Sequence, residues 1–492
     1  MEKYIISIDQ GTTSTRAILF TFDGKIKATS SRSLPCYYPY SGAVEQDPLE
    51  IIVSVNDTIH ELMIKENLTS EQILSIGITN QRETTIVWEK ETGKPVHNAL
   101  VWQSKQSQAI CESLKDKEEF IRSKTGLILN PYFSASKIRY ILDNIENGQE
   151  RAERGELLFG TVDTWVLYRL TKGKSFATDY SNASRTLLFN IFEKKWDEDL
   201  LKLFNIPSSM LPEVKESSCI FGYCDIGSES NLVPIAGILG DQQSSLFGQT
   251  CFTKGDIKNT YGTGCFLLMN IGDTPKLYDK GLLTTLAWGI DGKVTYAVEG
   301  SVLIGGASIQ WLRDELRIIE KSSDSEAIAY NTSNDDVYVV PAFVGLGTPY
   351  WDNNCRGAIF GLTRNSSRDV ITKATLESIA YQSKDVMEVM KKETKYKFNS
   401  LSVDGGASNN NYLLQFQSDI LNLRIRKSEI SETTALGVFY LCALTLKLFN
   451  NLEEIKKAHK VSCIFDSKMD RETRNKKYKK WKLAVSSARK FI

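Results

Sequence analysis

A carboxylate followed by a hydroxyl-rich turn lies near the start of this chain of 492 residues, in the run Asp9-Gln10-Gly11-Thr12-Thr13-Ser14-Thr15-Arg16. The apolar run Tyr4 to Ile8 before it has the composition of a buried strand. A glycine lets backbone N–H groups approach an anion, hydroxyls add donors, and an aspartate can hold a hydrated cation beside a phosphate. An ordinary hairpin has the same pattern, so this segment alone leaves both interpretations open.

Two more turns rich in glycine and hydroxyl residues occur far away in the sequence. They are Asn259-Thr260-Tyr261-Gly262-Thr263-Gly264 and Val403-Asp404-Gly405-Gly406-Ala407-Ser408-Asn409-Asn410. Three such turns, one near each end and one in the middle, predict a site assembled between two halves of the chain. In this order they resemble the phosphate and adenosine elements of the actin-like ATPase superfamily, which implies a nucleotide but leaves the substrate open.

A second set of polar residues could bind a small polyol. Gln81-Arg82-Glu83-Thr84-Thr85 and Gly240-Asp241-Gln242-Gln243 each combine donors and acceptors. An arginine beside a glutamate can bracket two neighbouring hydroxyl groups, because one donates hydrogen bonds and the other accepts them. The alternative is that Arg82 and Glu83 form a surface ion pair worth about 0–1 kcal/mol.

The elements that would position these residues alternate between short β-branched runs and amphipathic stretches, which indicates an α/β architecture. The chain is too long for one ordinary core, so we expect two domains, residues 1–248 and 249–492, with Gly248 and Gly255 as hinge positions. The halves begin alike, which suggests an old duplication. The pattern predicts strands at 73–79, 86–88 and 337–340, and helices at 372–390, 435–446 and around Trp481 in the basic C-terminal run.

Composition excludes several classes of function. The 60 basic and 60 acidic residues balance, so no global charge favours nucleic acid or a membrane surface. The apolar stretch 435–446 would be about 18 Å long as a helix, against a hydrocarbon core of ~30 Å, so no membrane span is expected. The chain shows no secretory leader, and its nine cysteines are dispersed, which is typical of reduced thiols in a cytoplasmic protein. Because His60, His97 and His459 lie away from every motif, a general base should be a carboxylate.

Together with the long stretches 300–316, 357–377 and 415–421, these motifs resemble the FGGY family of carbohydrate kinases, and within it the glycerol kinases, from residue 4 to about residue 485. The resemblance implies two actin-like, ribonuclease H-like domains, each a mixed sheet flanked by helices, with the active site in the cleft between them. It implies an ATP- and Mg²⁺-dependent transfer of phosphate to glycerol, with sn-glycerol 3-phosphate and ADP as products. It also implies a homodimer or larger homo-oligomer.

Carried over position by position, the resemblance assigns three sets of residues. Glycerol contacts are Arg82, Glu83, Trp102, Tyr132, Asp241, Gln242 and Phe266, with the two aromatic residues Trp102 and Phe266 against the carbon backbone. Nucleotide contacts are Thr12, Thr13, Ser14, Arg16, Thr263, Gly306, Gln310, Gly406 and Asn410. Mg²⁺ would be held through water by Asp9 and Asp241, and Asp241 would be the catalytic base.

The chain departs from the family pattern at several positions. The segment Trp102-Gln103-Ser104-Lys105-Gln106 lacks two arginines of the family motif, and Tyr140 replaces a tryptophan. Bacterial relatives bind fructose 1,6-bisphosphate through an arginine that is missing from the segment 230–235, so we expect that regulation to be absent. Segment 465–470 likewise lacks the pattern that docks the bacterial sugar-transport regulator.

Two rival functions remain open on the sequence. The nearer one is an FGGY kinase for another polyol or a sugar, because the nucleotide turns are shared across the family. The other is an actin-like or chaperone ATPase, which would need no polyol site and would hydrolyse ATP without an acceptor. Glycerol-dependent release of ADP would separate a glycerol kinase from such an ATPase.

Overall fold

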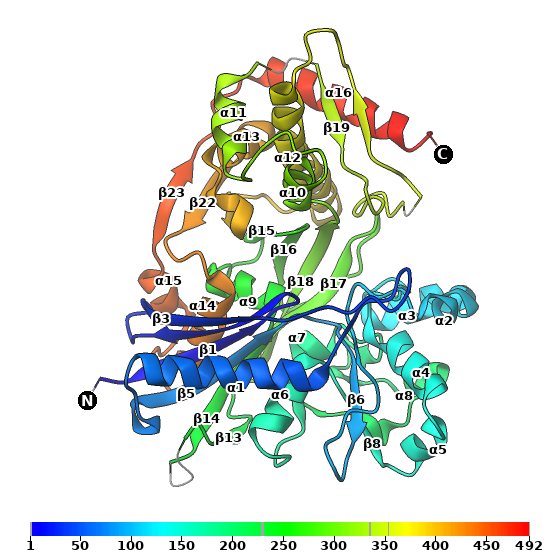
Figure 1. Ribbon diagram of the computed structural model, residues 1–492, viewed down its shortest axis with the longest axis vertical. Helices are drawn as coiled ribbons and strands as arrows, with labels where there is room; N and C mark the ends of the chain where they lie inside the picture. The colour runs from blue at the N-terminus through cyan, green and yellow to red at the C-terminus, as the bar shows by residue number, and fades with distance from the viewer. Residues whose placement is uncertain (1, 228–230, 334–335, 353, 492) are drawn as a thin grey trace.

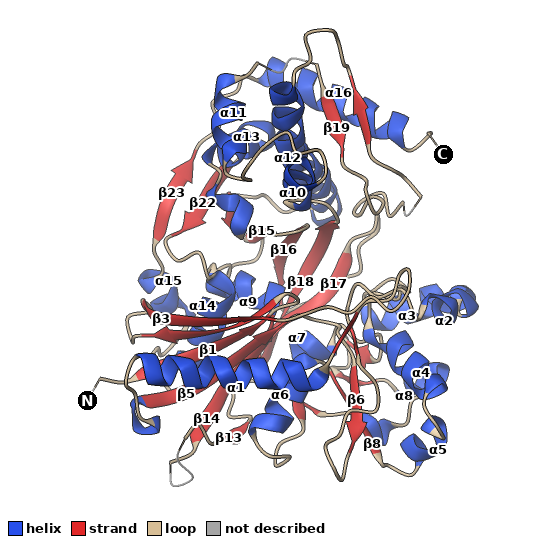
Figure 2. Cartoon of the chain, viewed as in Figure 1, coloured by secondary structure: helices blue, strands red, loops and turns tan. Residues whose placement is uncertain are grey.

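The computed structural model describes residues 2–227, 231–333, 336–352 and 354–491, which form two large sheets with helices on both sides (Figures 1 and 2). The first sheet has the order β13 (Gly222–Cys224), β14 (Val233–Gly240), β5 (Ile73–Asn80), β1 (Tyr4–Gln10), β2 (Ser14–Phe20), β3 (Ile26–Ser33). The second has the order β17 (Leu283–Ile290), β18 (Lys293–Val302), β16 (Cys265–Gly272), β15 (Ile257–Tyr261), β21 (Ser400–Asp404), β22 (Arg424–Ser428), β23 (Val461–Phe465). The predicted two-domain α/β fold with mixed sheets is confirmed.

The two sheets share one pairing pattern. In the first, β1 is antiparallel to β2 and parallel to β5, and β5 is parallel to β14. In the second, β15 is antiparallel to β16 and parallel to β21, and β21 is parallel to β22. Each half therefore opens with a hairpin whose turn carries a Gly-Thr pair, as the predicted duplication requires.

Side-chain alternation along β1 lets the first sheet bury both faces. Ile6 and Ile8 join the core under α1 (Pro48–Lys65) and α6 (Val162–Leu170), whereas Ile5 joins the core on the opposite face with α14 (Thr433–Thr445). The stretch predicted as a buried helix at 435–446 is therefore α14. Although it belongs to the C-terminal half of the sequence, it packs on the sheet of the N-terminal half.

Helix α14 crosses α9 (Asp241–Gly248) at very close range. A Cβ atom added at Gly248 would lie 2.0 Å from the carbonyl oxygen of Thr433, and one at Gly437 would lie 2.0 Å from that of Ser244. Glycine is therefore needed at Gly248 for helix contact. Gly255 has a φ of 93°, a left-handed conformation that favours glycine. That the two glycines act as hinges stays a prediction.

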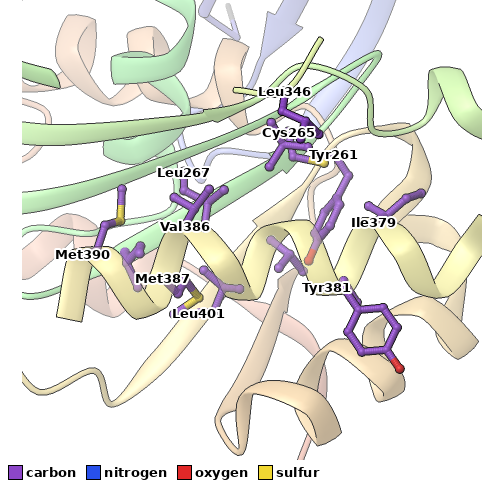
Figure 3. Packing of buried hydrophobic residues seen from close by; sticks show 14 of the residues in the cluster. Tyr261, Cys265, Leu267, Leu346, Ile379, Tyr381, Val386, Met387, Met390 and Leu401 are labelled. Carbon is purple, nitrogen blue, oxygen red and sulfur yellow. The ribbon is translucent and has the colours of Figure 1, made fainter. Parts of the chain in front are cut away.

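The core of the C-terminal half lies under α12 (Arg368–Thr394), which contains the predicted helix at 372–390 (Figure 3). Leu267 and Leu401 from the sheet pack with Val386 of this helix in one cluster. Trp481 of α16 (Arg471–Ala488) is fully buried and stacks on Tyr381 at 5.3 Å between ring centroids. The basic C-terminal run thus forms the expected terminal helix, and its tryptophan anchors one side of that helix to the core.

The remaining elements surround the two sheets. The predicted strands at 86–88 and 337–340 exist, but each belongs to a separate two-stranded sheet. Such pairs are β4 (Glu45–Gln46) with β7 (Ala99–Leu100), β6 (Ile86–Glu89) with β8 (Leu157–Gly160), β9 (Ala177–Asp179) with β12 (Glu213–Lys215), β10 (Phe189–Asn190) with β11 (Lys195–Trp196), and β19 (Tyr338–Val340) with β20 (Ala358–Phe360). The other helices are α2 (Gln108–Ser113), α3 (Glu118–Thr125), α4 (Ser134–Asn144), α5 (Gly148–Glu153), α7 (Tyr180–Ala183), α8 (Glu198–Phe204), α10 (Ala307–Asp314), α11 (Asp324–Asn331), α13 (Asn411–Leu421) and α15 (Leu452–Ala458).

The helices, cysteines and histidines bear on the predictions made from composition. None of the helices in the described part of the chain combines the length and apolar character needed to cross a bilayer. All nine cysteines are free thiols, as predicted. His60 is exposed, and His97 and His459 are half-buried.

Candidate active site

Parallel pairing brings the predicted polar residues to one edge of the first sheet. Asp9 of β1 pairs with Thr79 of β5, and Gly240 of β14 pairs with Asn80. The three strands therefore end together, which places the segment after β5 between Asp9 and the first residue of α9, Asp241. Because neighbouring strands are about 4.8 Å apart, the backbones of β1 and β14 are separated by roughly 10 Å.

Arg82 is buried at the centre of this edge. Its Nε lies 3.2 Å from Oδ1 of Asp241, and its Nη1 lies 2.6 Å from Oε2 of Glu299 and 3.2 Å from Oε1 of Gln243. Glu83, which is also buried, accepts from Nε of Arg185 at 2.6 Å. Nε of Arg82 and Oε1 of Glu83 lie 3.7 Å apart, but both side chains are buried, so the alternative of an ion pair at the surface is wrong.

Two charged residues that the sequence analysis missed complete this cluster. Arg185 donates through Nη2 to Oε1 of Glu299 at 3.0 Å, and both side chains are fully buried. Burial opposes ionisation of Glu299, but the guanidinium groups of Arg185 and Arg82 lower its pKa to about 2. The sequence signal for Glu299 was a single acidic residue inside the apolar strand β18.

Three predicted aromatic residues meet above this cluster. The ring of Trp102 lies 5.5 Å from that of Tyr132 and 6.4 Å from that of Phe266, both in edge-on arrangements. Phe266 comes from β16 of the second sheet, so residues of both halves form this aromatic wall. Nε1 of Trp102 donates to Oγ1 of Thr12 at 2.9 Å, which ties the wall to the first phosphate-type turn.

Asp241 is the predicted base, and its side chain is 31% exposed. It accepts from the backbone N–H of Gln242 at 2.7 Å and faces Nε of Arg82. Burial raises the pKa of Asp241, while Arg82 and Lys258 oppose that effect. A carboxylate with a raised pKa that is accessible to a ligand can accept a proton from a hydroxyl group.

Asp9 is the second carboxylate of the edge. Its Oδ2 lies 2.6 Å from Nη2 of Arg16, whose Nη1 lies 2.5 Å from Glu432, so Arg16 is held by two carboxylates. Burial raises the pKa of Asp9 despite the charge of Arg16. Thr12, Thr13 and Ser14 form the adjoining turn, in which the N–H of Gly11 donates to the carbonyl oxygen of Ser14 at 2.9 Å.

The carboxylates at this edge suit Mg²⁺. The described residues contain no cluster of three or more metal-binding side chains. Mg²⁺ is usually held by only one or two carboxylates together with water and phosphate oxygens. Asp9 and Asp241, on either side of the segment after β5, meet that requirement once a nucleotide supplies phosphate oxygens.

A cavity of about 500 Å³ adjoins the other two turns. It brings together five of the nine predicted nucleotide residues, which are Thr263, Gly306, Gln310, Gly406 and Asn410. Gly306 caps α10, and Asn410 caps α13 by accepting from the N–H of Leu413. The other four predicted residues, Thr12 to Ser14 and Arg16, lie at the edge of the first sheet and do not line the cavity.

One side of this cavity consists of residues that no sequence motif marks. Ser322, Ser325 and Glu326, from α11 and the segment before it, line the cavity, as does Leu376 of α12. Ser325 accepts from Nδ2 of Asn410 at 3.2 Å. These residues carry no glycine-rich or acidic motif, so only their place in the fold identifies them.

Two residues at positions that depart from the family pattern have their own local contacts. Gln106 donates to Oε1 of Glu45 at 2.9 Å, and Tyr140 is hydrogen-bonded to Tyr40 at 2.9 Å between hydroxyl oxygens. Within 230–235, Ser230 lies outside the described residues, and Val233 begins β14.

Comparison with known proteins identifies the family of the chain. The N-terminal domain model of the FGGY family of carbohydrate kinases matches residues 4–248, and its C-terminal domain model matches residues 257–446. A glycerol kinase of Petrotoga mobilis is 54% identical over 495 residues, covering 100% of this chain and 99% of the relative. A glycerol kinase of Staphylococcus haemolyticus is 52% identical over the same length, with the same coverage.

Solved structures give the same result for the fold. A Plasmodium falciparum glycerol kinase crystallised with ADP has a TM-score of 0.91 and 36% identity, covering 99% of this chain and 98% of its own. A gluconate kinase of Lactobacillus acidophilus has a TM-score of 0.87 at 22% identity, covering 99% of this chain and 97% of its own. The second likeness shows a shared fold alone.

Proposed function

Because this chain belongs to the FGGY family of carbohydrate kinases, we propose that it transfers the γ-phosphoryl group of ATP to glycerol, giving sn-glycerol 3-phosphate and ADP. The observation that carries the proposal is the cluster in which Arg82 and Asp241 are paired at 3.2 Å beneath the aromatic wall. The full-length relatives named glycerol kinase support the same substrate.

In this proposal, the substrate is recognised from two sides. Trp102 and Phe266 pack against the carbon atoms of glycerol, and Tyr132, which packs against the ring of Trp102, also contacts glycerol. Arg82 and Gln242 donate to glycerol hydroxyl groups, and Glu83 and Asp241 accept from them. The buried partners Glu299 and Arg185 hold Arg82 and Glu83 in place before the substrate arrives, which reduces the cost of ordering on binding.

The chemical step uses Asp241 as general base. Asp241 accepts the proton of the terminal hydroxyl while that oxygen attacks the γ-phosphorus in line. The turns around Thr12 and Thr263 receive negative charge from the phosphates, and the 500 Å³ cavity holds the adenosine. Mg²⁺, held by Asp9 and Asp241, would neutralise charge on the β- and γ-phosphates. Closure of the two halves would exclude water, since ATP hydrolysis is the competing reaction.

The proposal includes a cytoplasmic enzyme that forms a homodimer or a larger homo-oligomer. The proposed oligomeric state rests on the family resemblance, and the proposed location rests on the dispersed free thiols.

An acceptor panel tests the function. ADP release from MgATP is measured with glycerol, erythritol, xylulose and ribulose, and without any acceptor. We expect the largest kcat/KM with glycerol and little ADP release without an acceptor. A higher kcat/KM with a longer polyol or a sugar would assign the chain to another FGGY activity, and rapid ADP release that no acceptor changes would favour a plain ATPase.

A further inference from the structure

We propose that Lys258 is a positioning residue that fixes the side-chain amide of Gln242, so that its nitrogen and not its oxygen faces the substrate. The inference rests on the proposed function and extends it to a residue of the second sheet. Lys258 lies in β15, two residues before Thr260, and is fully buried. It has no place in the three motif turns or in the aromatic wall.

The contacts of Lys258 are short and directional. Its Nζ donates to Oε1 of Gln242 at 2.6 Å and to Oγ1 of Thr260 at 2.7 Å. A lysine ammonium group has three donors and no acceptor, so only the oxygen of an amide can face it. Lys258 thereby decides the orientation of the Gln242 amide, which would otherwise be free to rotate by a half-turn.

The consequence is a donor that is left for the ligand. Within the described ranges of the chain, Nε2 of Gln242 donates to no protein group. The residue as a whole is only 9% exposed. Gln242 follows Asp241 at the start of α9. An amide nitrogen beside the proposed base would donate to one hydroxyl oxygen while Asp241 accepts from another.

The charges around Lys258 keep its ammonium group in place. Asp404 of β21, Asp241 of α9 and Glu299 of β18 favour its charged form, whereas Arg82 opposes it. Burial is the largest influence and lowers the pKa of Lys258 to about 8. Asp404 is itself anchored, because its Oδ2 accepts from Oγ of Ser245 at 2.6 Å.

Lys258 also joins two parts of the site. Gln242 belongs to the helix that follows the first sheet, and Thr260 leads into the Gly-Thr-Gly turn beside the adenosine cavity. The single side chain of Lys258 therefore holds a polyol contact and a phosphate-type turn at a fixed separation.

A double-mutant cycle tests this role. Lys258→Met removes the donors and keeps a long side chain, so KM for glycerol should rise about tenfold while kcat stays within about threefold of the parent. In the Gln242→Ala background, the same change should alter KM less than twofold, because its effect passes through Gln242. An equal rise in both backgrounds would overturn the proposal.

Two further variants keep the test decisive if Lys258→Met folds poorly. Gln242→Glu still accepts from Lys258 but has no donor, so its KM for glycerol should rise at least as much as that of Gln242→Ala. A parental KM in Gln242→Glu would mean that the oxygen faces the substrate, and would overturn the proposal. Lys384→Met is the control, because Lys384 is also buried but donates to the carbonyl oxygen of Ile420, and its KM should not change.

The parent protein separates this inference from the proposed function. If the parent releases no ADP with glycerol, the proposed function fails. If the parent is active and Gln242→Glu keeps its KM, only the role of Lys258 fails.

Discussion

The carboxyl groups of Glu299 and Asp241 have pKa values shifted in opposite directions because their neighbours differ. Glu299 touches two guanidinium groups and stays ionised, with a pKa lowered to about 2. Asp241 is near one guanidinium group, and burial raises its pKa. A group that must take up a proton during turnover benefits from a raised pKa, whereas a group that only holds arginines benefits from a lowered one. This contrast favours Asp241 as the base and Glu299 as a structural anion.

Asp241→Asn should lower kcat by about 10²–10⁴, because the amide keeps the size of the side chain but cannot accept a proton. Glycerol should still bind through Arg82 and Gln242. The measurement is kcat at saturating glycerol and MgATP, with equilibrium binding of glycerol and a thermal melt to confirm folding. Turnover within a few-fold of the parent would exclude Asp241 as the base and leave Glu83 as the next candidate.

Thr263→Val should lower kcat more than it changes KM for glycerol. The side chain keeps its shape but loses a hydroxyl group beside the proposed phosphate position, and one such donor is worth up to about 2.7–4 kcal/mol. Initial rates at varied ATP and glycerol measure both parameters. Thr274→Val, in an exposed turn, is the control. Parental turnover in Thr263→Val would place this turn away from the transferred group.

At the scale of elements, the sequence predicted the turns well because their chemistry is local. The turn after Gly11 and the one around Gly262 need glycine and hydroxyl residues wherever they lie in a fold, and both follow β-branched strands that are easy to identify. The pairing partners of the strands were harder to predict from the sequence. The strand expected at 86–88 exists, but its pairing with β8 outside the main sheet depends on residues about 70 positions away.

The residues that the sequence analysis missed share a physical cause. Arg185, Glu299 and Lys258 are single charged residues in otherwise ordinary segments, and only the fold brings them to Arg82, Glu83 and Gln242. Single charged residues like these are usually solvated, so even the acidic residue inside the apolar strand β18 does not identify its partners. Ser325 and its neighbours were missed for the same reason, since no local pattern marks the α11 side of the cavity.

The crossing of α9 and α14 gives a prediction at this scale. Gly437→Ala should lower the urea midpoint of unfolding, because its Cβ would lie 2.0 Å from the carbonyl oxygen of Ser244, and overpacking typically costs 1–3 kcal/mol or more. The control is Gly155→Ala, which has a φ of 72° but nothing within 4 Å, so it should cost only about 1–2 kcal/mol of backbone strain. A smaller shift of the midpoint in Gly437→Ala than in Gly155→Ala would show that the helices separate freely.

At the scale of the whole molecule, the two halves are joined through buried contacts as well as through the chain. The pairs of Arg82 and Arg185 with Glu299 connect the segment after β5 to the second sheet. α14 brings apolar residues of the C-terminal half onto the first sheet. Any movement that closes the site must keep these buried charges paired, because breaking a buried pair costs about 3–5 kcal/mol.

Stability of the whole molecule should depend on Asp163, a fully buried carboxyl in α6. Burial and the nearby Asp179 raise the pKa of Asp163 to about 7, although it accepts from the hydroxyl groups of Thr161 and Thr178. The unfolded chain ionises this group near pH 4, whereas the folded protein keeps its proton up to about pH 7. Asp163 therefore makes the folded state less stable as pH rises from about 4 to about 7, by at most about 1.4 kcal/mol per pH unit.

Asp163→Asn removes that titration and leaves the shape of the side chain nearly unchanged. The stability of the variant relative to the parent should rise between pH 4 and pH 7 and then level off, as measured by urea midpoints at each pH. The matched control is Asp23→Asn, because the pKa of the exposed Asp23 is lowered to about 2. Asp23 is ionised in both the folded and the unfolded state above about pH 4, so the stability difference between this variant and the parent should stay constant from pH 4 to pH 7. A difference between Asp163→Asn and the parent that stays constant from pH 4 to pH 7 would show that Asp163 is ionised in the folded protein. In that case, the hydroxyl groups of Thr161 and Thr178 would compensate its charge more fully than burial opposes it.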